Sequence, residues 1–275
     1  MTDIVVLNIK TGEVVSENVK SWRTEDQDKA YREQQKKRKF YKTDTLAGRN
    51  FTMLFTREAK KEQYTLADLS RLGALIVLST YIQQDKDNKE IAKLPFKAVR
   101  SELSKVLCCS ESQATKMWKD LESIGAVYRE DAGLFVNPEL AYRGETKRND
   151  IVKVFHMNTR ALLAEGVKLA DIGLLFLTAP YIDRQTNYLC SNPNAPMSEE
   201  LELIGFNELA ELVGVDPKTL RNKFKKMSIE FGGKKLPVYL KVENPLNNKF
   251  AYIMNPLVIN RGMNDSDITT LFTML

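Results

Sequence analysis

A turn, a helix cap and a helix follow one another in residues 213–221, which read Val213-Gly214-Val215-Asp216-Pro217-Lys218-Thr219-Leu220-Arg221. Gly214-Val215 predicts a turn after a helix with an apolar face. Asp216 is a strong N-cap because its side chain can accept from free backbone N–H groups, and Pro217 occupies the first helical position, where proline is favoured. The stretch therefore predicts a helix-turn-helix. Apolar side chains of its second helix recur at helical spacing and are expected to face inward: Leu220, Phe224 and Met227.

A weaker version of the same order lies earlier in the chain. Residues 96–107 place apolar side chains at helical spacing, and Cys108-Cys109 predicts the turn. Ser110 is then the N-cap of a helix over residues 111–124. One face of that helix is apolar and the other is polar, which predicts a second helix-turn-helix.

Each helix-turn-helix is followed by short strands that predict a hairpin, or wing. In the earlier copy the strands lie within residues 126–136. In the later copy the hairpin is longer and is expected to pair residues 238–242 with residues 250–254. Lys234-Lys235 stands at the start of this second wing.

The two patterns belong to an internal repeat. Each copy opens with a Leu-Ala-Asp segment, runs through apolar residues to Tyr-Ile, and closes with Asn-Pro and Arg-Gly at the same spacing. In the first copy these segments are residues 66–69, 81–82, 137–138 and 143–144, and in the second they are residues 169–172, 181–182, 255–256 and 261–262. Matches at both ends of a long unit indicate two structural copies, residues 51–145 and 151–262.

Both helix-turn-helix segments resemble the recognition segments of winged-helix DNA-binding proteins. The strand that ends in Asn-Pro resembles the winged-helix replication initiators of Gram-positive plasmids and phages, and the opening residues 3–13 are similar to the leaders of such proteins. The resemblance covers most of residues 51–262. It implies a mainly α chain with small β wings (α+β), built as two tandem winged-helix domains with an N-terminal hairpin and a charged arm.

These patterns divide the chain into five parts. Residues 1–19 form an N-terminal β-hairpin around Thr11-Gly12, and residues 20–50 form a charged arm or linker. The two winged-helix domains follow, and the chain closes with a short C-terminal tail. Their bounds are residues 51–148, residues 149–262 and residues 263–275.

Positive charge is concentrated in two places. The net charge is +5 and the isoelectric point is about 8.9. Residues 20–49 hold ten Lys or Arg against five Asp or Glu, and residues 216–249 hold nine against three. Residues 100–130 are balanced, with five of each sign. Nucleic acid is therefore the expected partner of the later copy.

A polar, basic helix face fits the major groove of B-DNA. Arg221 can pair with guanine, and Gln113 and Asn222 with adenine, whereas lysines suit phosphates. The candidate DNA-binding residues are Ser112, Gln113, Lys116, Lys119, Lys218, Thr219, Arg221, Asn222, Lys225, Lys234 and Lys235. A charged helix face can also be merely solvated, and winged helices also bind proteins, so both alternatives stay open.

The composition argues against an enzyme. His156 is the single histidine, and the three cysteines lack the spacing of a zinc site. No glycine-rich phosphate loop of the Walker kind is present. We expect no catalytic residue, no metal and no cofactor. The short apolar stretches and the odd cysteine count indicate a cytoplasmic protein without a membrane span.

The expected function is sequence-specific binding of double-stranded DNA, in replication initiation or an accessory role for a plasmid or phage. Transcriptional repression for a mobile element uses the same surfaces and is the first alternative. The second alternative is a protein-interaction module acting on a host protein. Expected partners are double-stranded DNA and host replication proteins, and the N-terminal hairpin is a candidate element for homodimer formation.

Overall fold

The chain divides into two compact units, residues 1–45 and residues 46–275. The computed structural model describes residues 6–7, 14–16, 50–65, 67–84, 91–97, 99–131, 133–146, 148–196, 200–244, 249–261 and 272. In the first unit, strands β1 (Val6–Leu7) and β2 (Val14–Ser16) pair antiparallel, which confirms the predicted hairpin. The charged arm up to residue 49 and the C-terminal tail, apart from Phe272, lie outside the described residues.

The second unit contains both copies of the repeat. The first copy comprises β3 (Phe51–Phe55), α2 (Thr56–Ala59), α3 (Glu62–Thr65), α4 (Leu69–Ser79), α5 (Val99–Val106), α6 (Glu111–Ser123), β4 (Val127–Glu130), β5 (Gly133–Val136) and β6 (Ala141–Tyr142). The second copy comprises β7 (Ile151–Phe155), α7 (His156–Ala164), α8 (Leu169–Thr178), η1 (Ala179–Tyr181), α9 (Phe206–Leu212), α10 (Pro217–Lys226), β8 (Ser228–Phe231), β9 (Lys234–Pro237), β10 (Tyr239–Asn244), β11 (Lys249–Met254) and β12 (Ile259–Asn260).

The copies are joined through a central antiparallel sheet with the order β12-β7-β3-β6. Strand β3 of the first copy pairs with β7 of the second, and Phe51 lies opposite Phe155 at one end of the ladder. The last strand of each copy then pairs with that copy's own first strand. The sheet is therefore arranged about an approximate twofold relation between the copies.

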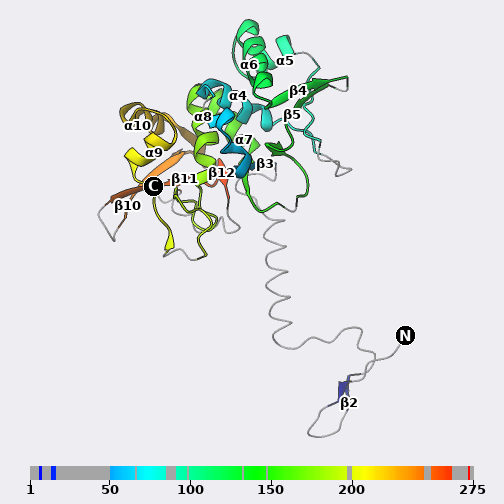
Figure 1. Cartoon of the computed structure of the whole chain (residues 1–275). Coiled ribbons are helices and arrows are strands. Elements are labelled where there is room, and N and C mark those ends of the chain that lie inside the picture. The colour runs from blue at the N-terminus through cyan, green and yellow to red at the C-terminus, as the bar shows by residue number, and fades with distance from the viewer. Residues whose placement is uncertain are drawn as a thin grey trace. The chain divides into compact units, whose positions relative to one another are not determined.

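Helices α4 and α8 pack against each other, and equivalent residues of the two helices make the same contact in both directions. A Cβ atom on Gly73 would lie 1.8 Å from the carbonyl oxygen of Leu169, and one on Gly173 would lie 2.0 Å from that of Leu69. Only glycine permits so close a backbone approach at these two positions. Figure 1 shows α4 and α8 in the middle of the unit, with α5 and α6 to one side and α9 and α10 to the other.

Hydrogen bonds at the end of each copy repeat as well. The Asn137 side chain donates to the carbonyl of Gly125 over 2.9 Å, and Asn255 donates to that of Pro237 over the same distance. Arg143 and Arg261 both donate to the carbonyl of an isoleucine, Ile82 in the first copy and Ile182 in the second. The internal repeat inferred from the sequence is confirmed by these equivalent contacts.

The expected fold class is wrong. The chain is not mainly α with small β wings in two tandem winged-helix domains, because helices and antiparallel strands are mixed in the described residues of both copies. One hydrophobic core also runs through both copies. The central strands have the sequences FTMLF (residues 51–55) and IVKVF (residues 151–155), rich in aromatic and β-branched residues. Both strands are short, and β3 pairs with β7 only where the two copies meet.

The two helix-turn-helix segments lie where they were predicted. Helix α6 begins after Ser110, whose side chain accepts from the backbone N–H of Gln113, and α10 begins after Asp216, whose side chain accepts from that of Thr219. The first helix of the earlier pair starts at Val99, later than the residue predicted. Residue Lys97 there donates its backbone N–H to the carboxylate of Glu102 rather than joining the helix.

The second copy has one hairpin more than predicted. Strands β8 and β9 pair through the turn Gly232-Gly233, where both residues have positive φ, 59° and 76°. This conformation suits glycine and matches the twist of a tight hairpin. The predicted hairpin of β10 and β11 follows it and is confirmed, with Val242 opposite Ala251.

Candidate nucleic-acid interface

Helix α10 holds its polar face outward through two buried anchors. The side chains of Leu220 and Phe224 are 0% and 4% exposed, which fixes the rotation of the helix about its axis. The Asp216 cap and Pro217 fix its start. The opposite face carries the exposed residues Lys218, Thr219, Arg221, Asn222, Lys225 and Lys226.

This face is strongly positive. The sequence of α10 contains five Lys or Arg and no Asp or Glu. Lys223 points to the side of the helix and pairs with Asp171 of α8, which compensates one of these charges. Within the described part of the chain, no ion pair involves Lys218, Lys225 or Lys226. Three lysines and Arg221 are therefore available to an anionic partner.

Arg221 is oriented by aromatic side chains. Its guanidinium carbon lies 5.1 Å from the centre of the Phe206 ring on α9, a cation–π distance. Arg221 also lowers the pKa of Tyr252, although burial raises that pKa more strongly. The guanidinium group is thus held at the edge of an aromatic cluster and remains exposed on its outer side.

The predicted lysines of the second wing lie on the additional hairpin. Lys234 and Lys235 open β9 and are exposed. Lys235 lies directly opposite Glu230 in the β8–β9 ladder, so a negative charge accompanies it. This hairpin adds less net positive charge than the α10 face does.

Helix α6 presents a different face. Ser112, Lys116 and Lys119 are exposed, but Glu111, Asp120 and Glu122 belong to the same helix. Glu111 pairs with Arg100 over 2.6 Å, and Asp120 pairs with Arg71 over 2.9 Å. Mixed charges of this kind favour ion pairs within the protein over contact with phosphates.

Gln113 has a local role in α6. Its Oε1 atom accepts from the backbone N–H of Ser110 over 3.1 Å, while Ser110 Oγ accepts from the backbone N–H of Gln113. This arrangement is a capping box. To pair with adenine, the Gln113 side-chain amide must donate and accept a hydrogen bond at the same time. Its oxygen is already used in the capping box, so the capping box competes with the predicted contact to adenine.

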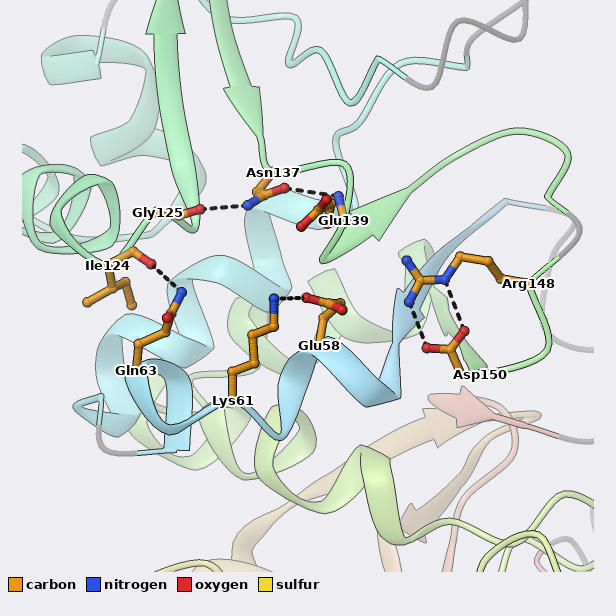
Figure 2. A network of polar contacts seen from close by, with 9 residues as sticks. All are labelled: Glu58, Lys61, Gln63, Ile124, Gly125, Asn137, Glu139, Arg148 and Asp150. Carbon is orange, nitrogen blue, oxygen red and sulfur yellow. Dashed lines mark hydrogen bonds and ion pairs between the residues drawn. The ribbon is translucent and has the colours of Figure 1, made fainter.

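A polar network fixes the far end of α6 (Figure 2). Gln63 of α3 donates to the carbonyl of Ile124, and Asn137 donates to the carbonyl of Gly125. Carbonyls at the end of a helix have no partner within the helix, and these side chains supply one for each. The same view shows Lys61 paired with Glu58 over 2.5 Å, and Arg148 paired with Asp150.

His156 is the first residue of α7, directly after β7, and is 4% exposed. The Thr52 hydroxyl donates to the carbonyl of Ser79, so its oxygen must accept the Nε2–H of His156, 2.8 Å away. Burial, together with Arg143 and Arg160 nearby, lowers the pKa of His156 to about 3. His156 is therefore a neutral structural donor at physiological pH. Among the described residues, no three His, Cys, Asp or Glu gather as a metal site would require.

Three features of the interface were missed from the sequence. Lys226 is exposed on the same face as Lys225. Lys241 of β10 lies over the ring of Phe250, with 3.3 Å between its Nζ atom and the ring centre. Phe250 itself is 46% exposed. Apolar and polar side chains alternate along residues 239–243 and 249–254, which predicts a hairpin. This pattern does not show which aromatic side chains contact α10.

Comparisons of the chain with protein-family profiles, with curated proteins and with solved structures gave no match in any of the three. Within the described residues, every helix is too short or too polar to cross a lipid bilayer.

Proposed function

We propose that this protein binds double-stranded DNA in a sequence-specific manner, with α10 as the principal reading helix. The observation that carries the proposal is the exposed face of α10, where Lys218, Arg221, Lys225 and Lys226 gather without an acidic residue. Its buried anchors keep this face outward before any ligand binds. A rigid, basic helix is suited to the major groove, where it can meet base edges and phosphates together.

The side chains divide the work by their chemistry. Arg221 has the planar, two-pronged donor set that pairs with guanine, and Asn222 can pair with adenine. Lys218, Lys225 and Lys226 are point charges that suit phosphates and make binding dependent on salt. Lys234 and Lys235 reach a neighbouring phosphate in this proposal, with Lys235 weakened by Glu230 opposite.

The approximate twofold relation makes α6 and α10 equivalent helices of the two copies, and we propose that they act as the paired helices of a dimeric helix-turn-helix protein do. Such dimers bind two half-sites on DNA. We propose that α10 holds the stronger half-site and α6 a weaker one, through Ser112, Lys116 and Lys119. The nearly balanced charge of α6 also suits a host replication protein as its partner.

The biological role that we propose is initiation of replication, or an accessory step of it, for a plasmid or phage. Its place would be the cytoplasm, where such DNA is found. Cys108, Cys109 and Cys190 are all free thiols, which agrees with a reducing compartment. A transcriptional repressor would use the same α10 face, so target position on the DNA decides between these roles.

Binding of the full-length protein to duplex DNA tests the proposal. Fluorescence anisotropy would compare DNA that flanks the gene with random DNA of equal length at 50 and 200 mM salt. We expect tighter binding to the flanking DNA, and a loss of affinity of at least about tenfold at the higher salt. Equal binding to both DNAs would remove sequence specificity, and no binding to either would leave the protein-interaction role.

A further inference from the structure

A hollow of about 630 Å³ lies beside the DNA-reading face of α10. It is bounded by α9, α10 and the hairpin of β10 and β11. Aromatic residues form half of its described lining, with three basic side chains and no acidic one among the rest. The aromatic residues are Phe206, Phe224, Tyr239, Phe250 and Tyr252, and the basic ones are Arg221, Lys225 and Lys241.

The floor of the hollow is rigid. The rings of Phe224 and Tyr239 stack with 3.7 Å between their centres and 4° between their planes. Tyr252 meets Phe224 nearly edge-on, at 5.3 Å and 73°. The Thr178 hydroxyl donates to the carbonyl of Leu174, so the Tyr239 hydroxyl donates to Thr178 over 3.0 Å. With that hydroxyl satisfied, the aromatic floor keeps its shape before a ligand arrives.

The rim differs from the floor because it is exposed. Phe250 leaves 46% of its surface accessible, an unusual fraction for a large apolar side chain, and Lys241 lies over its ring. Arg221 and Lys225 stand on the α10 side of the hollow and are exposed too. The hollow thus offers the exposed ring of Phe250 for stacking and cations for an anion, within one space.

A nucleotide that has left the double helix combines the two chemistries that this site needs. Its base can stack on aromatic rings, and its phosphate can contact lysine or arginine. Proteins that hold single strands commonly join aromatic stacking platforms to a basic groove in this way. The volume also lies within the range of ordinary ligand sites, roughly 300–1,000 Å³.

We infer that this hollow binds an unpaired nucleotide of a single DNA strand, next to the duplex held by α10. The inference rests on the proposed function, because Arg221 and Lys225 belong both to the reading face and to the rim of the hollow. Phe250 and Lys241 belong to the hollow and lie outside the reading face. The strand would leave the duplex at α10 and pass over the β10–β11 hairpin.

The test uses full-length protein and two DNA probes. One probe is an oligothymidine strand carrying a single 2-aminopurine, whose fluorescence falls when the base stacks. The other is a duplex taken from DNA that flanks the gene. We expect the wild type to bind both probes and to quench 2-aminopurine in the single strand.

Two substitutions separate the sites. Phe250→Ala should weaken single-strand binding about tenfold and restore 2-aminopurine fluorescence, while duplex binding stays unchanged. Phe250→Trp should retain the quenching because it keeps a stacking surface. Lys218→Ala, which changes the reading face outside the hollow, should weaken duplex binding and leave the quenching unchanged.

The outcomes distinguish this inference from the proposed function. Duplex binding without single-strand binding would overturn the nucleotide site and leave the reading helix standing. Single-strand binding that Phe250→Ala leaves unchanged would also overturn it, and would point to another occupant, such as an acidic peptide of a partner. Failure to bind either probe would overturn both proposals. Thermal melting of each variant would show that the fold is kept.

Discussion

Helices α6 and α10 occupy equivalent places in the two copies, yet they present opposite chemistry. Both begin at a side-chain cap, and both turn one large aromatic residue inward, Trp118 in α6 and Phe224 in α10. The outward face of α10 carries basic residues and no acidic one, whereas α6 has acidic residues, two of which pair with Arg71 and Arg100. The two copies therefore share the cap and the buried aromatic residue that hold each helix in place, but the charge of the exposed helix face differs.

The surroundings extend this difference. Beside α10 lies an aromatic hollow with a basic rim, formed with the β10–β11 hairpin. Beside α6, the hairpin of β4 and β5 is short and carries Glu130 at its end. The two copies therefore share a helix position but differ in the surface beside that helix.

The contact between the copies should be the most sensitive part of the molecule. Gly73→Ala, or Gly173→Ala, should lower the free energy of unfolding by about 4 kcal/mol or more, because the new Cβ would overlap a backbone carbonyl of the opposite helix. The two effects should be similar, since the contact is reciprocal. Urea denaturation followed by circular dichroism measures both.

Gly205→Ala is the matched control, since nothing lies within 4 Å of a Cβ atom there. Its effect should stay below about 1 kcal/mol. If Gly73→Ala unfolded only the first copy, in a separate transition, the copies would not share one core.

Replacement of the α10 anchor should be the next largest effect. Leu220→Ala should lower the free energy of unfolding by about 2–5 kcal/mol, because it removes a fully buried side chain. Arg221→Ala, one residue later, should change it by less than about 0.5 kcal/mol, because that side chain is exposed. Thermal or urea unfolding would check both, and a large loss in Arg221→Ala would mean that α10 is rotated about its axis.

The copies should also differ in their response to pH. His156 follows β7, where the first copy has Thr56 after β3. Its folded pKa, about 3, lies below that of an unfolded histidine, near 6.5, so the unfolded chain takes up the proton first. Stability is therefore full above pH 6.5 and should fall by about 2 kcal/mol between pH 6.5 and 5.

Urea denaturation of the wild type and of His156→Gln over this range would isolate the histidine. The variant should be less stable at pH 7, but its stability should change much less between pH 6.5 and 5. An equal pH dependence in both proteins would show that His156 is accessible to protons in the folded state.

Single lysine substitutions should produce the smallest effects and compare the two helices directly. Lys225→Ala should weaken duplex binding and reduce the slope of log affinity against log salt by about 1, as expected for one lost phosphate contact. Lys119→Ala on α6 should change the slope less, because acidic neighbours surround it. Anisotropy titrations at several salt concentrations would measure both slopes.

Local features of the fold could be predicted from the sequence, because they depend on neighbouring residues. The caps Ser110 and Asp216, the turn at Gly214 and the repeat itself were all found in this way. The central sheet was not, because Phe51 pairs with Phe155, a residue far along the chain. A strand of five residues carries little signal until its partner is known.

Two misses had different causes. The β8–β9 hairpin could have been predicted, because Gly232-Gly233 between alternating strands is a strong turn signal. The aromatic hollow could not, because its residues come from two helices and three strands that meet only in the folded chain. Exposure of Phe250 and the stacking of Phe224 on Tyr239 are properties of packing rather than of spacing.

We propose that α10 contributes more than α6 to DNA binding. The measurement that tests this directly is the affinity of two multiple variants for the flanking duplex DNA. The α10 variant combines Lys218→Ala, Lys225→Ala and Lys226→Ala. The α6 variant combines Lys116→Ala and Lys119→Ala. We expect the α10 variant to lose most of the wild-type affinity and salt dependence, and the α6 variant to keep most of both. Equal losses in the two variants, or a greater loss in the α6 variant, would contradict it.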